Sequence, residues 1–291
     1  MRLRTTPWLR RMVPLRIAVA RAEARGRALW ERDPEARQRA LAAIEAIVAG
    51  TARAGEVTAL ARQHLIETEV YEVMFWRPWI VPAIDAASDE RLRRTLARDG
   101  GVLISVCHLG TMFLSMARVL ALGHTPYSVV APWLFESAGS GDWDRRLDRW
   151  WTAIRARDER LVPSVGSFPV LQALLEQGEV VQLFFDMPGG GETRFLGKPV
   201  MLATGSARLA VQAGVPIVPM RARRDGHRMH ADVGEPLDPS EFASVEDLHQ
   251  ALAAVHERWI LEVPASLEDP RRPGAWELGA TATGWSRPGS A

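Results

Sequence analysis

GGVLISVCHLGTMFLS, residues 100–115, begins with two glycines and an apolar run, then passes through a histidine turn into a second apolar stretch. The run at 102–106 is apolar at nearly every position, which is typical of a parallel strand buried on both faces. Helical spacing begins at Met112, so the pattern predicts a strand, a turn and a helix. The turn carries His108 to the carboxyl end of the strand, the edge at which open α/β sheets bind ligands. His108 is therefore a candidate acid or base, with a structural histidine as the alternative.

Apolar runs alternate with helical patterns along the rest of the chain. Further strands are expected at 127–131, 161–165, 180–185, 215–220 and 230–233, with helices between them and a closing helix at 247–263. Two helical patterns at 34–75 come before the first strand. This order predicts an α/β fold with a mixed, mainly parallel central sheet, covered by helices on both faces and preceded by a helical N-terminal lead.

We divide the chain into three parts: a basic amphipathic segment at 1–33, a single α/β domain at 34–269 and a flexible tail at 270–291. The first part mixes arginines with large apolar residues. It is interpreted either as a segment that lies on an anionic membrane surface or as a helix packed on its own domain. The tail is rich in Gly, Pro, Ser and Thr, which is typical of a loop or of disorder.

Composition narrows the class of protein. The 291 residues include 36 basic and 35 acidic residues, a net charge of +1, so overall charge indicates no nucleic-acid partner. The single cysteine allows neither an intramolecular disulfide nor a cysteine-rich zinc site. No apolar run reaches the length of a membrane span, and arginines interrupt any signal-peptide core. We expect a cytoplasmic protein, either free or peripheral on the inner face of the cell membrane.

Three short motifs carry the candidate chemistry. His108-Leu109-Gly110 follows one predicted strand, Phe185-Asp186-Met187-Pro188 follows another, and RFLGKP stands at 194–199. A small-residue helix start and a Val-Pro strand come next. The glycines at 189–191 lack the Lys-Ser/Thr of a phosphate-binding loop and are interpreted as a turn.

This order of motifs resembles the lysophospholipid acyltransferase superfamily. The nearest branch is that of the bacterial lipid A lauroyl/myristoyl acyltransferases and the phosphatidylinositol mannoside acyltransferases. The resemblance implies transfer of a fatty acyl group from a thioester donor, acyl-CoA or acyl carrier protein, to a hydroxyl or amine acceptor. It implies that His108 is the general base and that no metal or redox cofactor takes part. Substrate-binding roles are implied for five residues: Gly110, Thr111, Arg194, Gly197 and Lys198.

One position departs from the family pattern. In this branch an acidic residue stands five positions after the histidine and orients its ring, whereas here the position is Phe113. Loss of such a carboxylate lowers the rate of a comparable triad by about 10⁴-fold. Three interpretations follow. Another carboxylate orients His108, the acceptor is a group that needs less activation than an alcohol, or the protein binds a lipid, acyl chain or protein partner without catalysis.

Two predictions can be checked directly. His108 and Asp186 both follow apolar strands, so we expect them at the same edge of one sheet. We expect a carboxylate other than position 113 within hydrogen-bond reach of His108, with Glu136 the first choice and Asp186 the second, because Asp186 could pair with Arg194 instead. Cys107 is interpreted as a buried structural residue rather than a nucleophile, since neighbours along a strand point to opposite faces.

Overall fold

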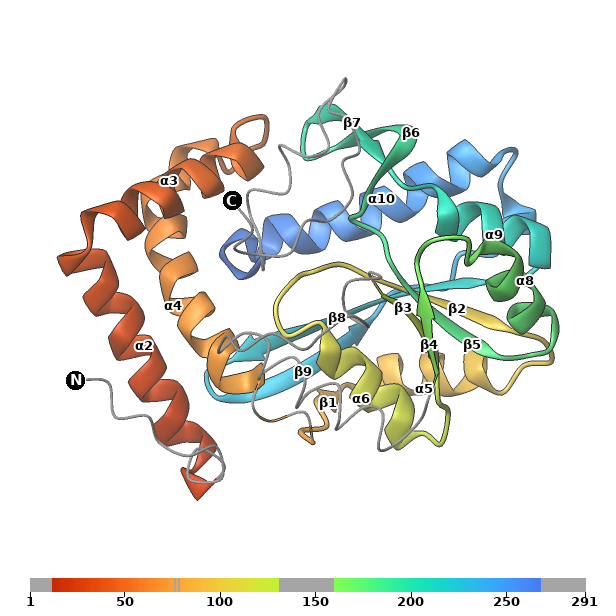
Figure 1. The fold of residues 1–291 in the computed structure, drawn as a ribbon, viewed down its shortest axis with the longest axis horizontal. Helices are drawn as coiled ribbons and strands as arrows, with labels where there is room; N and C mark the ends of the chain where they lie inside the picture. The colour runs from red at the N-terminus through yellow and green to blue at the C-terminus, as the bar shows by residue number, and fades with distance from the viewer. Residues whose placement is uncertain (1–11, 76, 78, 131–159, 268–291) are drawn as a thin grey trace.

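The computed structural model describes residues 12–75, 77, 79–130 and 160–267 (Figure 1). The helices in this part of the chain are α2 (Leu15–Arg32), α3 (Pro34–Val48), α4 (Val57–Phe75), α5 (Ala86–Leu96), α6 (Phe113–Ala121), α8 (Phe168–Glu176), α9 (Gly205–Ala213) and α10 (Val245–Glu262). Short 3₁₀ turns are η1 (Ala54–Glu56), η3 (Pro239–Glu241) and η4 (Pro264–Ser266). The strands are β1 (Ala83–Ile84), β2 (Val102–Val106), β3 (Tyr127–Val130), β4 (Leu161–Pro163), β5 (Val180–Phe184), β6 (Pro188–Phe195), β7 (Lys198–Leu202), β8 (Ile217–Asp225) and β9 (Arg228–Val233).

Seven strands form one sheet in the order β1-β9-β8-β2-β5-β3-β4. Every neighbouring pair is parallel except β8 and β9, which form an antiparallel hairpin. β2 lies in the middle, between β8 and β5, and all five of its residues are buried. The predicted fold class, a mixed and mainly parallel sheet with helices on both faces, is confirmed.

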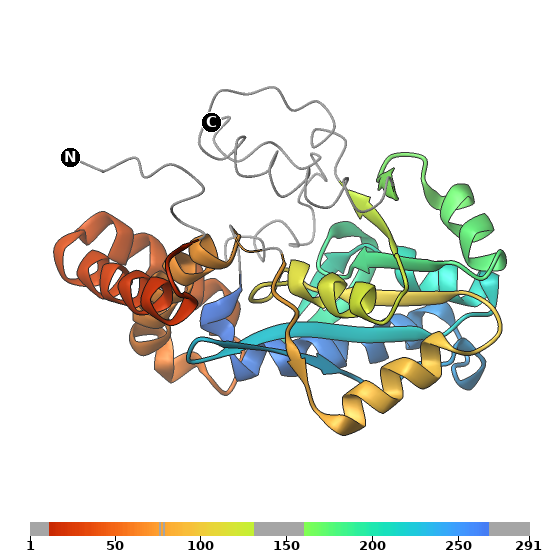
Figure 2. The same cartoon turned by 90° about the horizontal axis from the view of Figure 1, so that it is seen from below.

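The two faces of the sheet bury alternate residues of β2. Leu103 belongs to a core cluster with residues of α8, α9 and α10, whereas Ile104 belongs to a cluster with residues of α5 and α6. Figure 1 accordingly has α9 and α10 above the strands and α5 and α6 below them, and Figure 2 has α5 and α6 in front. Alternation of this kind is what a strand with a two-residue side-chain period produces.

The N-terminal helices lie together at one end of the sheet (Figure 1). α2 packs along α4, and the contact is so close that a Cβ on Gly26 would lie 2.5 Å from the Cα atom of Ile66. Within the described residues, no helix is long and apolar enough to cross a membrane. The contact with α4 shows that residues 15–32 form a helix packed on its own domain. The tail at 270–291 lies outside the described residues.

β6 and β7 form a separate antiparallel hairpin beside the sheet. The prediction of a turn at 189–191 is wrong, because these glycines belong to β6. A Cβ on Gly189 would lie 2.4 Å from the Cα atom of Ala203, so the missing side chain lets two backbone segments approach each other.

Candidate active site

His108 and Asp186 form a buried pair at the carboxyl edge of the sheet. His108 Nδ1 lies 2.8 Å from Asp186 Oδ1, and the backbone N–H of His108 donates to Asp186 Oδ2 at 3.1 Å. Asp186 is fully buried and His108 is 5% exposed. Both carboxylate oxygens thus accept hydrogen bonds from one residue, which fixes the ring relative to its own backbone.

The pairing follows from the register of two neighbouring strands. β2 and β5 are parallel, with Val106 opposite Phe184, and the ladder continues one step further where the Phe185 N–H donates to Val106 O at 2.7 Å. His108 and Asp186 each stand two residues beyond the last paired residue of their strand. They therefore lie at the same edge, as the sequence predicts. Glu136, the first choice for this partner, lies outside the described residues.

The ring of His108 is held in a defined orientation. It stacks on Phe184, with ring centroids 4.1 Å apart and planes inclined by 19°. An ionised carboxylate can only accept hydrogen bonds, so Nδ1 is the nitrogen that carries the proton toward Asp186. In the neutral ring, Nε2 then keeps its lone pair and faces away from Asp186. This is the tautomer that a general base needs.

Phe113 occupies an apolar environment. It is the first residue of α6, and it packs in a cluster that includes Val70, Met74 and Met229. The ring of Tyr71 meets it edge-on, with centroids 6.0 Å apart. A carboxylate at this position would leave water for a cluster of aliphatic and aromatic groups. The phenylalanine and its surroundings are therefore mutually consistent, and the carboxylate beside His108 comes from β5 instead of α6.

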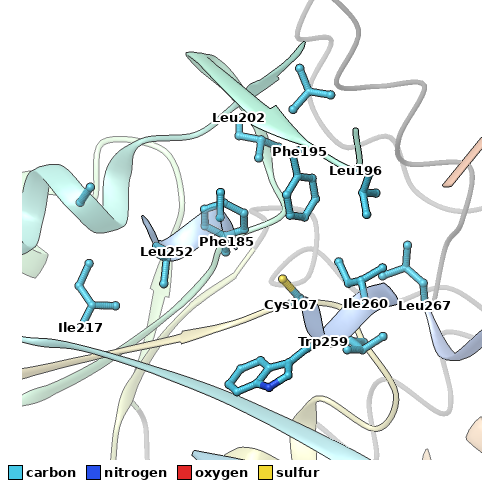
Figure 3. Close-up of a cluster of buried hydrophobic side chains, with 14 of the residues drawn as sticks. Cys107, Phe185, Phe195, Leu196, Leu202, Ile217, Leu252, Trp259, Ile260 and Leu267 are labelled. Carbon is cyan, nitrogen blue, oxygen red and sulfur yellow. The ribbon is translucent and has the colours of Figure 1, made fainter. Parts of the chain in front are cut away.

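Cys107 lies on the opposite face of β2 from the cluster around Phe184. It is 3% exposed and belongs to the core cluster of α9 and α10. Figure 3 shows its sulfur among Phe185, Ile260 and Trp259. This environment fits the interpretation of a buried structural cysteine.

A cavity of about 360 Å³ adjoins the turn that follows His108. Its walls are one side of α4, the end of the β8–β9 hairpin, residues 262–267 and residues 109–111. Thr111 lines it and is 5% exposed, and its hydroxyl has no hydrogen-bond partner among the described residues. Gly110 has a φ of +59°, and a Cβ there would lie 2.6 Å from Ala222 O, so only glycine fits this turn.

The candidates on the β6–β7 hairpin have packing contacts of their own. A Cβ on Gly197 would lie 2.1 Å from Gly50 O, and Lys198 Nζ donates to Ala46 O at 3.4 Å, near the C-terminus of α3. The backbone of Arg194 exchanges two hydrogen bonds with the side chain of Gln250 on α10, while its own side chain is exposed. Arg194 therefore does not take Asp186 away from His108. Binding roles for these three residues stay predictions.

Two buried histidines on α10 were missed by the sequence argument. His256 Nε2 lies 2.9 Å from Ser105 Oγ, and its ring stacks on Phe185 at 5.0 Å. His249 Nε2 lies 2.9 Å from Thr193 Oγ1. Burial lowers the pKa of His256 to about 3, against a smaller opposing effect of the Asp186 charge, and burial lowers the pKa of His249 to about 4. Their spacing of seven residues, on the same face as Leu252, was the available signal.

A metal centre has no support in the described ranges, because no group of three or more His, Cys, Asp or Glu side chains there could hold an ion. The chemistry available at the site is that of the His108–Asp186 pair, a base held beside a carboxylate, and residues 109–111 of the turn that follows His108 line a cavity.

Comparisons with known proteins bear on this site. A family model described as bacterial lipid A biosynthesis acyltransferase matches residues 6–267. Among solved structures, the 1-acyl-sn-glycerophosphate acyltransferase PlsC from Thermotoga maritima is similar, with a TM-score of 0.42 and 16% sequence identity; the match covers 73% of this chain and 82% of that chain. No match was found among curated protein sequences. The family match includes every residue of the site described above.

Proposed function

The chain belongs to the bacterial lipid A biosynthesis acyltransferase family, and we propose that it moves a fatty acyl group from a thioester donor to a hydroxyl or amine acceptor, with His108 as general base. The donor is acyl-CoA or acyl carrier protein. The order of the motifs supports the further proposal that the chain is nearest to the lauroyl/myristoyl and phosphatidylinositol mannoside acyltransferase branch. The observation that carries the proposal is the buried hydrogen bond between His108 Nδ1 and Asp186 Oδ1.

The reaction needs one proton acceptor and one stabilising charge. His108 Nε2 takes the proton from the O–H or N–H group of the acceptor, whose oxygen or nitrogen attacks the carbonyl carbon of the thioester. The new ester or amide bond forms as the C–S bond breaks. The leaving thiolate takes the proton from the imidazolium, which returns His108 to its neutral form. Asp186 stays ionised throughout and stabilises the imidazolium.

We propose that Asp186 performs the orienting role that the family pattern assigns to the position of Phe113. Asp186 accepts from both Nδ1 and the backbone N–H of His108, so the tautomer and the ring position depend on one carboxylate. A buried carboxylate with two donors gives the imidazolium a counter-charge in a region of low dielectric, where that charge is effective.

The cavity beside residues 109–111 is the proposed location of the acceptor. Thr111 offers it a buried hydroxyl that has no hydrogen-bond partner among the described residues, and an unmet hydrogen bond of this kind costs about 1–3 kcal/mol. A bound hydroxyl or amine could satisfy that group while standing next to the histidine turn.

A membrane surface is proposed as a further partner of the 1–33 segment. Arg16 and Arg21 are exposed on α2, and Ile17 beside them is 39% exposed. The double change Arg16→Glu and Arg21→Glu should weaken sedimentation with phosphatidylglycerol vesicles, as added salt should. Equal sedimentation of wild type and the double variant at low salt would contradict binding of this segment to a membrane surface.

The test of the reaction is thiol release and acyl transfer from a panel of acyl-CoAs, octanoyl to stearoyl, and the matching acyl carrier proteins, followed by mass spectrometry. We expect free thiol from wild type and about 10³–10⁴-fold less from His108→Ala. Tight binding of an acyl thioester without turnover would indicate instead the binding relative that the sequence left open. Equal turnover by wild type and His108→Ala would contradict a role for His108 as base.

A further inference from the structure

Residues 263–267, called here the strap, pair with residues 109–110 of the histidine turn, the segment that follows His108. The Gly110 N–H donates to Ser266 O at 2.7 Å, and Leu109 forms an antiparallel bridge with Leu267. The strap follows α10 directly and contains η4. The backbone just after His108 is thus bound to a segment more than 150 positions away in the chain.

The strap is in turn held by α4. His64 Nδ1 lies 2.9 Å from Ala265 O. A carbonyl oxygen only accepts, so Nδ1 is the donor in this hydrogen bond. His64 is half-buried, and η4 packs against α4. His64, on one of the N-terminal helices, therefore contacts the carbonyl of Ala265. The next residue, Ser266, is the one that accepts the N–H of Gly110.

The opposite side of the turn is closed by β8. Gly110 approaches Ala222 O so closely that no Cβ fits between them. The turn is confined between the strap and β8, and His108 is tied to Asp186 through its own N–H. A shift of the strap would therefore act on the backbone of Leu109 and Gly110, which follow His108 directly.

We propose that His64 is a positioning residue for acyl transfer, which acts by holding the strap against the histidine turn. The inference rests on the proposed function for its kinetic consequence, but the mechanical link can be measured without it. His64 donates a hydrogen bond to Ala265 O, Ser266 O receives the N–H of Gly110, and the imidazole of His108 keeps the position that its reaction requires. Misplacement of a reacting group by about 1 Å can cost about 10²-fold in rate.

The kinetic test compares His64→Leu with His64→Asn in the full chain. Leucine removes the donor, whereas the Asn Nδ2 group stands close to the place of Nδ1 and can donate to Ala265 O. For thiol release from acyl-CoA we expect kcat to fall about 10- to 100-fold in His64→Leu, with KM within about 2-fold, and to recover to within about 3-fold in His64→Asn. Thr58→Ala, an exposed change on the same helix and away from the cavity, is the matched control and should match wild type.

Hydrogen exchange provides the second readout, independent of turnover. Peptides that cover 105–113 and 263–267 should exchange faster in His64→Leu than in wild type, and at the wild-type rate in His64→Asn and Thr58→Ala. Unchanged exchange in His64→Leu, or equal loss of kcat in the leucine and asparagine variants, would overturn the positioning role. If wild type releases no thiol but exchange changes as expected, the strap contact stands and the proposed function fails.

Discussion

The end of β5 and the start of α6 flank the same histidine turn and bury a residue each, but the two environments differ in polarity. At the end of β5, Asp186 is fully buried and accepts two hydrogen bonds from His108. At the start of α6, Phe113 is buried among apolar side chains and meets Tyr71 edge-on. One region has the donors that a buried carboxylate requires, whereas the described cluster around Phe113 is apolar. The comparison teaches that the partner of a histidine can be supplied by a neighbouring strand when the helix does not supply it.

Asp186→Asn should have the largest effect. An amide has one acceptor oxygen where the carboxylate has two, so either the N–H or Nδ1 of His108 loses its partner, and Nε2 can become the protonated nitrogen. We expect kcat for thiol release to fall about 10⁴-fold. Asp85→Asn is the matched control, because Asp85 also accepts a backbone N–H, at the N-terminus of α5, and asparagine caps helices well. Full activity of Asp186→Asn would show that the reaction does not depend on the carboxylate of Asp186.

Phe113→Glu tests the other region. The change removes a buried ring and adds a carboxylate to an apolar cluster, so the free energy of unfolding should fall by about 3–5 kcal/mol. Phe113→Leu keeps the site apolar and should cost less than about 1.5 kcal/mol. Urea denaturation followed by circular dichroism measures both. Combined with Asp186→Asn, Phe113→Glu should recover at most a small part of the lost activity. Full rescue would show that a charge fits at residue 113 after all.

The histidines of α10 predict how stability depends on pH. The pKa values of His249 and His256 lie near 4 and 3 in the folded protein, below the usual value of 6.5, so the unfolded chain binds these protons first. Stability is then fully present above pH 6.5 and is lost as the pH falls toward 4, by up to about 1.4 kcal/mol per pH unit for each group. Urea midpoints between pH 7 and 4 check this. His249→Gln should make the urea midpoint depend less on pH, whereas the exposed His227→Gln should leave this dependence unchanged. The same pH dependence in wild type and in both variants would show that burial of His249 is not the cause.

Thr111→Val should have the smallest effect. Valine has nearly the shape of threonine but lacks the hydroxyl that has no partner among the described residues. We expect the free energy of unfolding to rise by about 1 kcal/mol, while KM for the acceptor rises once an acceptor is known. A loss of stability of similar size would show that the hydroxyl is already satisfied within the protein.

The sequence was sufficient for the sheet and for the edge at which the site lies, because buried strands such as 102–106 and 180–184 are apolar at all but one position each. It also indicated that residue 113 could not orient His108. It did not rank Asp186 above Glu136, since that choice depends on which strands are neighbours and on their register. The strap and the contact between His256 and Ser105 were out of reach for a related reason. They depend on contacts between segments far apart in the chain, for which a local pattern carries no signal.

The central claim is that His108 and Asp186 act as one unit, and a double-mutant cycle on thiol release tests it most directly. Groups that act together show strongly non-additive losses. We predict that His108→Ala with Asp186→Asn is no slower than His108→Ala alone, because the carboxylate has no function without the ring it orients. Losses that multiply, so that the double variant is slower by the product of the two single effects, would contradict the account.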